Sequence, residues 1–313
     1  EKLQGLHPIV GEVLEYRMLT KLKSTYADGL LKVISSDGRI HTNFQMTVTA
    51  KGRLSSTEQN LQNIPTRTDL GSEIRKMFVP AEGCVLVDAD YSQIELRLLA
   101  HISGDEAMLD AFCTGQDVHT RTASEIFDVP LSEVDSTLRS RAKAVNFGII
   151  YGMGDFSLAS DIKVTKKQAG EYIQSYFEKY PKVDEYLKNV VEQAKLDGYV
   201  TTLYGRRRYI PELTAQNGNL RAFGKRVAMN APIQGAAADI MKCAMLRVAS
   251  RLDREGLDAA LVMQVHDELL VEAKISDAPR VKEILREEME SAASLSVPLT
   301  VDVSVGYNWL DQE

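Results

Sequence analysis

The sequence predicts an α+β fold, because stretches typical of β-strands flank a long block with helical periodicity. One strand is predicted over residues 85–90, a β-branched run that ends in acidic residues. Apolar runs on both sides of residues 266–268 predict a hairpin of two further strands. Between them, residues 105–229 follow an almost wholly helical pattern. A chain of 313 residues can bury a full core, as one large domain with lobes or as two domains.

The tip of the predicted hairpin carries His266, Asp267 and Glu268, and lacks the Asn-Gly or Asp-Gly pair that tight turns favour. Two adjacent carboxylates beside buried strands repel each other unless a cation lies near them. A solvated acidic turn would explain the pair if it stood alone. However, Asp90 ends the first strand where a helical pattern begins, and such strand ends commonly carry active residues. If the strands are neighbours, Asp90 and Asp267 converge.

Converging carboxylates on a rigid sheet edge suit magnesium, which accepts one or two carboxylates and fills its other sites with water and substrate phosphates. Two such ions about 3.5–4 Å apart would clamp the attacking and leaving oxygens of an in-line phosphoryl transfer. We therefore expect a two-magnesium site at Asp90 and Asp267.

A helix predicted over residues 138–151 carries Arg139, Lys143, Phe147 and Tyr151 at every fourth position. Side chains at this spacing lie about 40° apart around the axis, so one flank presents two cations and then two rings. This flank resembles a nucleoside-triphosphate reader, in which Arg139 holds a phosphate bidentately and Lys143 stabilises or protonates departing pyrophosphate. Two surface cations beside two core aromatics would give the same spacing.

The first hundred residues are predicted to combine a helix, short strands and a polar loop. Helical spacing covers residues 8–23, and strands are predicted over residues 30–33 and 39–44. Residues 49–65 have too few apolar side chains to anchor themselves in a core. Such loops are functional or disordered, and a solvated loop is the alternative. Donors suited to phosphate, sugar or base edges in this loop are Arg53, Asn60, Gln62 and Asn63.

Three further elements are predicted from periodicity. They are helices over residues 91–102 and 281–293 and a half-buried closing strand over residues 301–305.

Charge is unevenly distributed within a formal net charge of −7. Residues 136–226 carry 16 Lys and Arg against 9 Asp and Glu, whereas residues 227–313 carry 8 against 15. A basic segment beside an acidic one suits a polyanion track next to a metal-binding cluster, although uneven surface charge would look the same.

Composition excludes several classes of protein. The three widely spaced cysteines support neither a disulfide framework nor a zinc site, and they suit a reducing compartment. No apolar stretch is long enough to cross a bilayer. The chain starts with Glu-Lys-Leu-Gln, without an initiator methionine or a signal-peptide pattern, and we expect it to be a fragment of a longer protein.

Six stretches resemble the signature motifs of the family A DNA polymerases, in the family's order and spacing. Asp-Tyr-Ser-Gln-Ile-Glu-Leu-Arg at residues 90–97 resembles motif A, the helical flank at 139–152 motif B, and Gln-Val-His-Asp-Glu at 264–268 motif C. The other three lie at residues 49–56, 60–65 and 230–235. The resemblance covers essentially the whole chain and falls on the C-terminal polymerase portion of bacterial members.

The resemblance implies a right-hand architecture with an antiparallel-sheet palm, a helical fingers insert and a thumb that is mostly absent. Residues 1–20 would be a remnant of the thumb, and residues 105–229 the fingers. Residues 21–104 and 230–313 would form the two parts of the palm. We expect neither proofreading nor 5′-nuclease activity from these residues.

The resemblance also implies site residues. Asp90 and Asp267 would hold two Mg²⁺ ions with the Tyr91 carbonyl as a further ligand, and Glu268 and Lys143 would also be catalytic. Nucleotide would be bound by His119, Arg139, Lys143, Phe147, Tyr151 and Glu95, of which Glu95 would exclude a ribose 2′ hydroxyl. Primer-template would be lined by Arg53, Asn60, Gln62, Arg226, Asn230, Gln234 and His266, which would check pairing through the degenerate minor-groove code.

The activity implied is template-directed DNA synthesis in replication and repair. Partners would be primer-template DNA and deoxynucleoside triphosphates, for a monomer with no membrane partner in the bacterial cytoplasm near the nucleoid. A single-subunit RNA polymerase would need room where Glu95 stands. A non-catalytic DNA-binding module would be expected to have lost the carboxylates, which are present in this sequence. A metal-dependent nuclease would have no use for the helical flank that carries Arg139.

Overall fold

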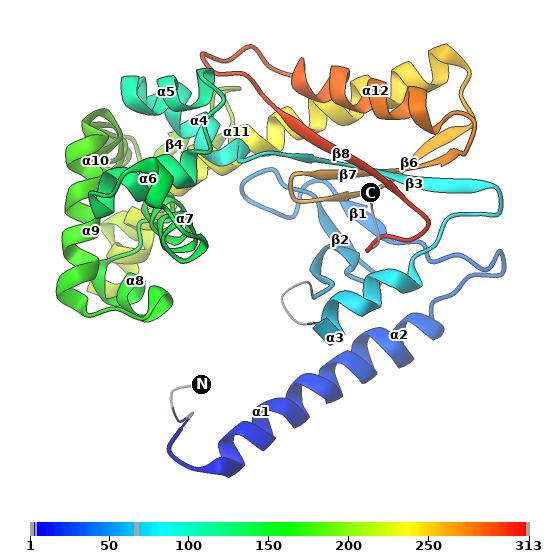
Figure 1. Cartoon of the computed structure of the whole chain (residues 1–313), viewed down its shortest axis with the longest axis horizontal. Helices are drawn as coiled ribbons and strands as arrows, with labels where there is room; N and C mark the ends of the chain where they lie inside the picture. The colour runs from blue at the N-terminus through cyan, green and yellow to red at the C-terminus, as the bar shows by residue number, and fades with distance from the viewer. Residues whose placement is uncertain (1–2, 4, 66–68, 311–313) are drawn as a thin grey trace.

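The computed structural model describes residues 3, 5–65 and 69–310, which form a sheet lobe and a helical lobe (Figure 1). The central sheet has four antiparallel strands in the order β6–β7–β3–β8, with bounds Ala259–Val265, Glu268–Lys274, Cys84–Tyr91 and Val301–Gly306. The helical lobe contains α5 Glu106–Cys113, α6 Val118–Phe127, α7 Ser136–Ile150, α8 Asp155–Ile162, α9 Lys166–Lys179 and α10 Pro181–Asp197. The predicted α+β class is confirmed.

The register of the sheet brings the end of β3 beside the hairpin tip. Asp90 pairs with Glu268 of β7 on one side and with Asp302 of β8 on the other. The amide of Tyr91 donates to the carbonyl oxygen of Asp267 at 3.1 Å. The strands that carry the two predicted carboxylates are therefore neighbours, as the convergence argument requires.

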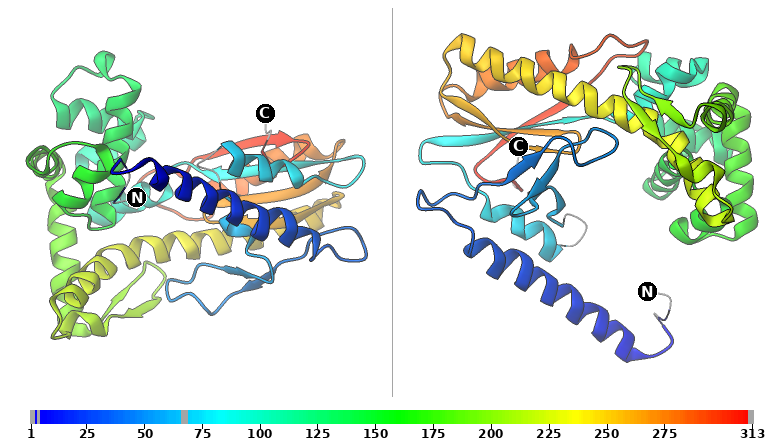
Figure 2. Two further views of the ribbon diagram at one scale, coloured as in Figure 1. Left: turned by 90° about the horizontal axis from the view of Figure 1, so that it is seen from below. Right: turned by 180° about the vertical axis from the view of Figure 1, so that it is seen from behind.

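Both faces of the sheet are covered. On one face lie α11 (Gly218–Glu255), α12 (Ala278–Glu290) and α4 (Ile94–Ser103), which share the main apolar core with Val87 and Ala89 of β3. Figure 2 shows α11, which contains Pro232, continuing from the sheet lobe to the helical lobe, so that one helix connects the two lobes.

The other face of the sheet packs against the N-terminal segment. The helix predicted over residues 8–23 is α1 (Pro8–Lys21), followed by a π-helical turn and α2 (Asp28–Leu31). The strand predicted over residues 30–33 is wrong, since Tyr26 and Leu30 are buried in the same cluster at the i,i+4 spacing of a helix. Of the strand predicted over residues 39–44, an isolated bridge at Ile40 and the start of β1 (Asn43–Gln45) are present.

The predicted lack of anchors in residues 49–65 is also wrong. Leu61 and Ile64 are 3% and 6% exposed, because they enter the cluster that Leu86 and Trp309 form on this face of the sheet. Local order comes from β2 (Ser55–Thr57), which pairs with β1, and from the 3-10 helix Leu61–Asn63.

Most of the remaining predicted elements are present. The helices over 91–102, 138–151 and 281–293 correspond to α4, α7 and α12, and the closing strand to β8. The helical block is interrupted by a hairpin of β4 (Tyr199–Thr201) and β5 (Arg207–Tyr209), which periodicity did not reveal. Short helices are α3 Asp69–Ser72 and the 3-10 turns Glu73–Met77, Leu131–Glu133 and Pro211–Thr214.

The close approach of α11 to the turn before it gives a test of the packing. A Cβ atom on Gly224 would lie 2.9 Å from the Leu213 nitrogen and 3.0 Å from the Glu212 carbonyl carbon. We expect Gly224→Ala to lower the free energy of unfolding by about 1–3 kcal/mol, because backbone must move. The matched Gly170→Ala in α9 meets nothing within 4 Å and should raise it by about 0.5–1 kcal/mol. Urea denaturation measures both; equal effects would contradict this packing.

Candidate active site

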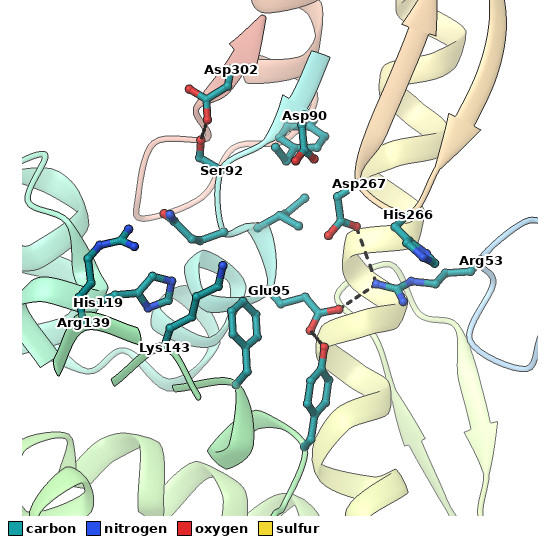
Figure 3. A pocket seen from close by; sticks show the side chains of 15 residues that line it. Arg53, Asp90, Ser92, Glu95, His119, Arg139, Lys143, His266, Asp267 and Asp302 are labelled. Atoms are coloured by element: carbon teal, nitrogen blue, oxygen red, sulfur yellow. Dashed lines mark hydrogen bonds and ion pairs between the residues drawn. The ribbon is translucent and has the colours of Figure 1, made fainter. Parts of the chain in front are cut away.

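A cavity of about 500 Å³ lies where the end of β3, the β6–β7 tip and α7 meet (Figure 3). Its walls come from both lobes, so its side chains are far apart in sequence. The lining residues are Arg53, Asp90, Tyr91, Ser92, Gln93, Ile94, Glu95, His119, Arg139, Lys143, Phe147, Tyr151, His266, Asp267 and Asp302.

Asp90 and Asp267 line the same wall of this cavity, with their carboxylates exposed to its interior (Figure 3). Burial, together with the negative charges of Glu268, Asp267 and Asp302, raises the pKa of Asp90 to about 7. Burial also raises the pKa of Asp267, against the lowering effect of Arg53. The two acids therefore lie in a field of excess negative charge, which a bound cation would relieve.

The donor set fits magnesium better than zinc. Among the residues that the structure describes, no group of three or more His, Cys, Asp and Glu side chains is arranged to hold an ion. Asp90 and Asp267 would supply hard oxygens from two side chains, and the Tyr91 carbonyl is the expected further ligand. Such an incomplete shell is what Mg²⁺ accepts when water and phosphate oxygens provide the remaining ligands.

Glu268 faces different partners from its neighbour Asp267. Its carboxylate accepts a hydrogen bond from Trp309 Nε1 at 2.6 Å and lies 3.8 Å from Arg75 Nη1. The hairpin thus separates its two acids, with one in the cavity wall and the other paired behind it. Two residues before Asp90 on β3, burial and the charges of Glu268 and Asp90 raise the pKa of Asp88, whose Oδ1 has no hydrogen-bond partner.

Arg53 joins the polar loop to the acidic wall. Its Nη2 donates to Glu95 Oε1 at 2.8 Å and lies 3.8 Å from Asp267 Oδ1. The Tyr151 hydroxyl donates to the other Glu95 oxygen at 3.1 Å. Burial raises the pKa of Glu95, which is 4% exposed, and Arg53 opposes that rise. Glu95 is therefore held from both sides on the floor of the cavity.

The predicted flank of α7 faces the cavity with all four of its side chains. Arg139 donates to Asp117 through Nε at 3.1 Å and Nη2 at 2.7 Å. Burial favours a higher pKa for the Asp117 carboxyl, but hydrogen bonds from Arg139 and Thr120 outweigh it and lower that pKa to about 2. Lys143 has no carboxylate partner among the described residues, so its charge is available to a ligand.

The aromatic half of the flank forms a stack at the end of α7. The rings of Phe147 and Tyr151 are nearly parallel, with centroids 6.4 Å apart. His119 lies against Phe147 with a centroid distance of 5.9 Å. The cavity lining therefore combines the cations Arg139 and Lys143, the imidazole of His119 and the two aromatic rings.

The predicted DNA-contact residues outside the cavity lie on the polar loop and on α11. Asn230 and Gln234 of α11 both accept hydrogen bonds from Lys51 Nζ. Gln62 donates to the Gln264 carbonyl oxygen at 3.0 Å, which ties the polar loop to β6. The remaining predicted residues outside the cavity are exposed: Asn60 and Arg226.

Several lining residues were not predicted. Ser92 Oγ donates to Asp302 Oδ2 at 2.5 Å, and Gln93 adopts a left-handed conformation before α4. Lys51 was also not predicted, although it lies within the motif at residues 49–56 that contains Arg53. The signal for Asp302 was its polar place in an alternating strand, but only pairing with β3 brings it to the site.

The family model for DNA polymerase family A matches residues 1–311. The chain belongs to DNA polymerase family A. DNA polymerase I of Caldicellulosiruptor bescii is 53% identical over 312 residues, covering 99% of this chain and 37% of the relative. DNA polymerase I of Geobacillus stearothermophilus is 51% identical, with 99% and 36% covered. The thermostable DNA polymerase I of Thermus aquaticus is 48% identical, with 99% and 37% covered.

The family A fold is also found in a similar solved structure. The POL domain of Pol1 from M. smegmatis, in complex with DNA primer-template and dNTP, superposes with a TM-score of 0.93 at 46% identity. That match covers 98% of this chain and 54% of the other. The chain therefore spans about 36–37% of the length of the curated relatives above.

Proposed function

We propose that this chain is the part of a family A polymerase that performs template-directed DNA synthesis. It would add deoxynucleotides to a primer 3′ end by phosphoryl transfer and release pyrophosphate, in DNA replication and repair. The observation that carries this proposal is that Asp90 and Asp267 share one cavity with Arg139 and Lys143. A similar POL domain was solved with primer-template and dNTP, which supports the same partners here.

In this proposal the sheet lobe is the palm and the helical lobe the fingers. Residues 21–104 and 230–313 form the palm, residues 105–229 the fingers and residues 1–20 a remnant of the thumb. Within the part of the chain that is described, no helix has both the length and the apolar character to cross a membrane. We further propose that the protein acts as a monomer on bacterial DNA, in the cytoplasm near the nucleoid.

Asp90, Asp267 and the Tyr91 carbonyl would hold two magnesium ions. When bound, such ions lower the pKa of the primer 3′ hydroxyl and neutralise charge on the phosphates. Arg139 would give one phosphate a bidentate contact, which requires it to exchange Asp117 for the ligand. Lys143 would stabilise departing pyrophosphate or give it a proton, and Glu268 would support the acidic wall from behind.

Phe147 and Tyr151 would flank the sugar and base of the incoming nucleotide, with His119 on its phosphates. Because Glu95 is fixed by Arg53 and Tyr151, it would block a 2′ hydroxyl with little freedom to move. Primer-template would lie along Arg53, His266 and the residues beside the cavity, namely Asn60, Gln62, Arg226, Asn230 and Gln234.

Primer extension with magnesium and deoxynucleotides tests this function. We expect added nucleotides to follow the template sequence and synthesis to stop when EDTA removes the metal. A chain that extends nothing, or an Asp267→Ala variant that extends as well as the parent, would contradict the proposal. Supplying ribonucleotides distinguishes an RNA polymerase, and a labelled duplex without nucleotides distinguishes a nuclease.

Glu95→Ala is expected to weaken sugar discrimination. Removing the carboxylate opens space beside the Tyr151 ring, so the preference for deoxynucleotides over ribonucleotides should fall roughly 10- to 100-fold. The comparison is kcat/KM for dATP and ATP on one primer-template. Tyr151→Phe, which removes only one hydrogen bond to Glu95, is the matched control and should change the ratio less. An unchanged ratio in Glu95→Ala would refute the assigned role.

A further inference from the structure

A buried asparagine holds the histidine of the cavity. Asn146 is 0% exposed on the inner side of α7 and belongs to the face of that helix that points into the lobe, away from the flank that faces the cavity. Its Nδ2 lies 3.0 Å from Nδ1 of His119 on α6 and 3.2 Å from Thr122 Oγ1. Asn146 therefore spans the two helices that position the cationic wall.

The same network extends from Asn146 to a carboxylate. The Tyr180 hydroxyl donates its proton to Glu125 Oε2 at 2.5 Å. The Thr122 hydroxyl has two acceptors within reach, Asn146 Oδ1 at 3.3 Å and the Tyr180 oxygen at 3.4 Å. With either acceptor, Asn146 Nδ2 donates, with one hydrogen directed at Thr122 Oγ1 and the other at His119 Nδ1.

The carboxylate end of the network is itself fixed. Arg121 donates to Glu125 Oε1 at 3.1 Å and to Asp110 Oδ2 at 2.7 Å. Burial and the neighbouring Glu125 charge raise the pKa of the Tyr180 hydroxyl, so it remains a donor.

We propose that Asn146 is a positioning residue that fixes the tautomer of His119, with the proton on Nε2 and the lone pair on Nδ1. The ring then presents an N–H donor to the cavity beside Arg139 and Lys143. If the amide were reversed, a neutral ring would present a lone pair and repel phosphate oxygen. This inference rests on the proposed triphosphate site.

The tautomer matters because His119 is neutral. Burial, with the charges of Arg139 and Lys143, lowers its pKa to about 4, and Asp117 only partly opposes this. A neutral imidazole has one donor, so its placement decides whether the ring attracts or repels a phosphate. A donor without a charge also adds a directional contact without further repulsion between cations.

Nitrogen NMR of chain labelled with [15N]histidine reads the tautomer directly. The chain has five histidines, and a His119→Gln variant identifies the His119 signals. We expect the parent to carry its ring proton on Nε2, and Asn146→Asp to move a proton to Nδ1, because the new carboxylate accepts. A parent proton on Nδ1, or an unchanged His119 in Asn146→Asp, would overturn the proposal.

Tyr180→Phe provides a second test that leaves Asn146 in place. Without the phenol, the Thr122 hydroxyl can still donate to Asn146 Oδ1, which lies 3.3 Å away, so the parent tautomer is expected. A proton moved to Nδ1 of His119 in Tyr180→Phe would show that the phenol, and not Asn146, fixes the ring and would overturn the proposal.

The kinetic consequence is a change in nucleotide binding. Asn146→Asp should raise KM for deoxynucleotide about tenfold with kcat little changed, as expected for one lost hydrogen bond to a charged group. A raised KM with an unchanged tautomer would contradict the proposed cause. The tautomer is measured without DNA or nucleotide, so a chain with the expected tautomer that extends no primer would refute the proposed function alone.

Discussion

Asp267→Asn is expected to lower the rate of nucleotide addition about 10³-fold or more, the largest effect of any single change considered. Asparagine keeps the shape of the side chain but removes the charge that holds a cation, and electrostatic stabilisation is the main term in phosphoryl transfer. Single-turnover incorporation on a saturating primer-template measures the chemical step. Asp267 lines the same cavity as Asp90, at the hairpin tip whose strand β7 pairs with β3.

Two further variants separate position from charge. Asp253→Asn removes one carboxylate from the exposed end of α11 and should leave the rate unchanged. Glu268→Gln should have an intermediate effect, because that side chain is engaged by Trp309 behind the wall. Equal losses in Asp267→Asn and Glu268→Gln would mean that the two acids act as one unit, contrary to their separate partners.

Lys143→Gln is expected to lower kcat about 10²- to 10³-fold, within the range for loss of a positioned proton donor or charge. Lys143 has no carboxylate partner among the described residues, whereas Arg139 is paired with Asp117. The unpaired cation should therefore contribute most when charge develops on the leaving group. Rapid-quench measurement of pyrophosphate release reports this step.

Arg141→Gln is the matched control for Lys143→Gln. Arg141 lies two positions away on α7 and lines a different hollow, with Ser136 and Lys163. The same loss of one charge from the same helix should leave kcat within about threefold, since exposed charges contribute little at a distance. A comparable loss in both variants would indicate that the net charge of α7 matters and not the place of Lys143.

The parts of this site that could be predicted from sequence are those governed by local periodicity. One flank of a helix carries every fourth residue, so a common flank is expected for Arg139, Lys143, Phe147 and Tyr151 as soon as the helix forms. A β-branched run that ends in Asp90 and a hairpin tipped by Asp267 likewise place both acids at strand ends. Only the adjacency of the strands had to be assumed, and the register supplies it.

The parts that could not be predicted depend on long-range packing. The turn at residues 35–38 favours a strand over residues 30–33, whereas the helical spacing of Leu30 to Tyr26 is revealed only by their burial in a shared cluster. Leu61 and Ile64 anchor a stretch that looked too polar, since a cluster from distant elements receives them. Asn146 lies within a motif, but its contacts with His119 and Thr122 depend on the packing of α6 against α7.

The central claim is that folding brings Asp90 and Asp267 together to hold a pair of divalent cations against a nucleotide. The most direct test is a crystal of the chain with primer-template, a non-hydrolysable deoxynucleotide and Mn²⁺, examined by anomalous scattering. We predict two manganese peaks, each in contact with both carboxylates or with one of them and a phosphate. Peaks that touch neither acid, or a nucleotide bound away from the flank of Lys143, would contradict the account.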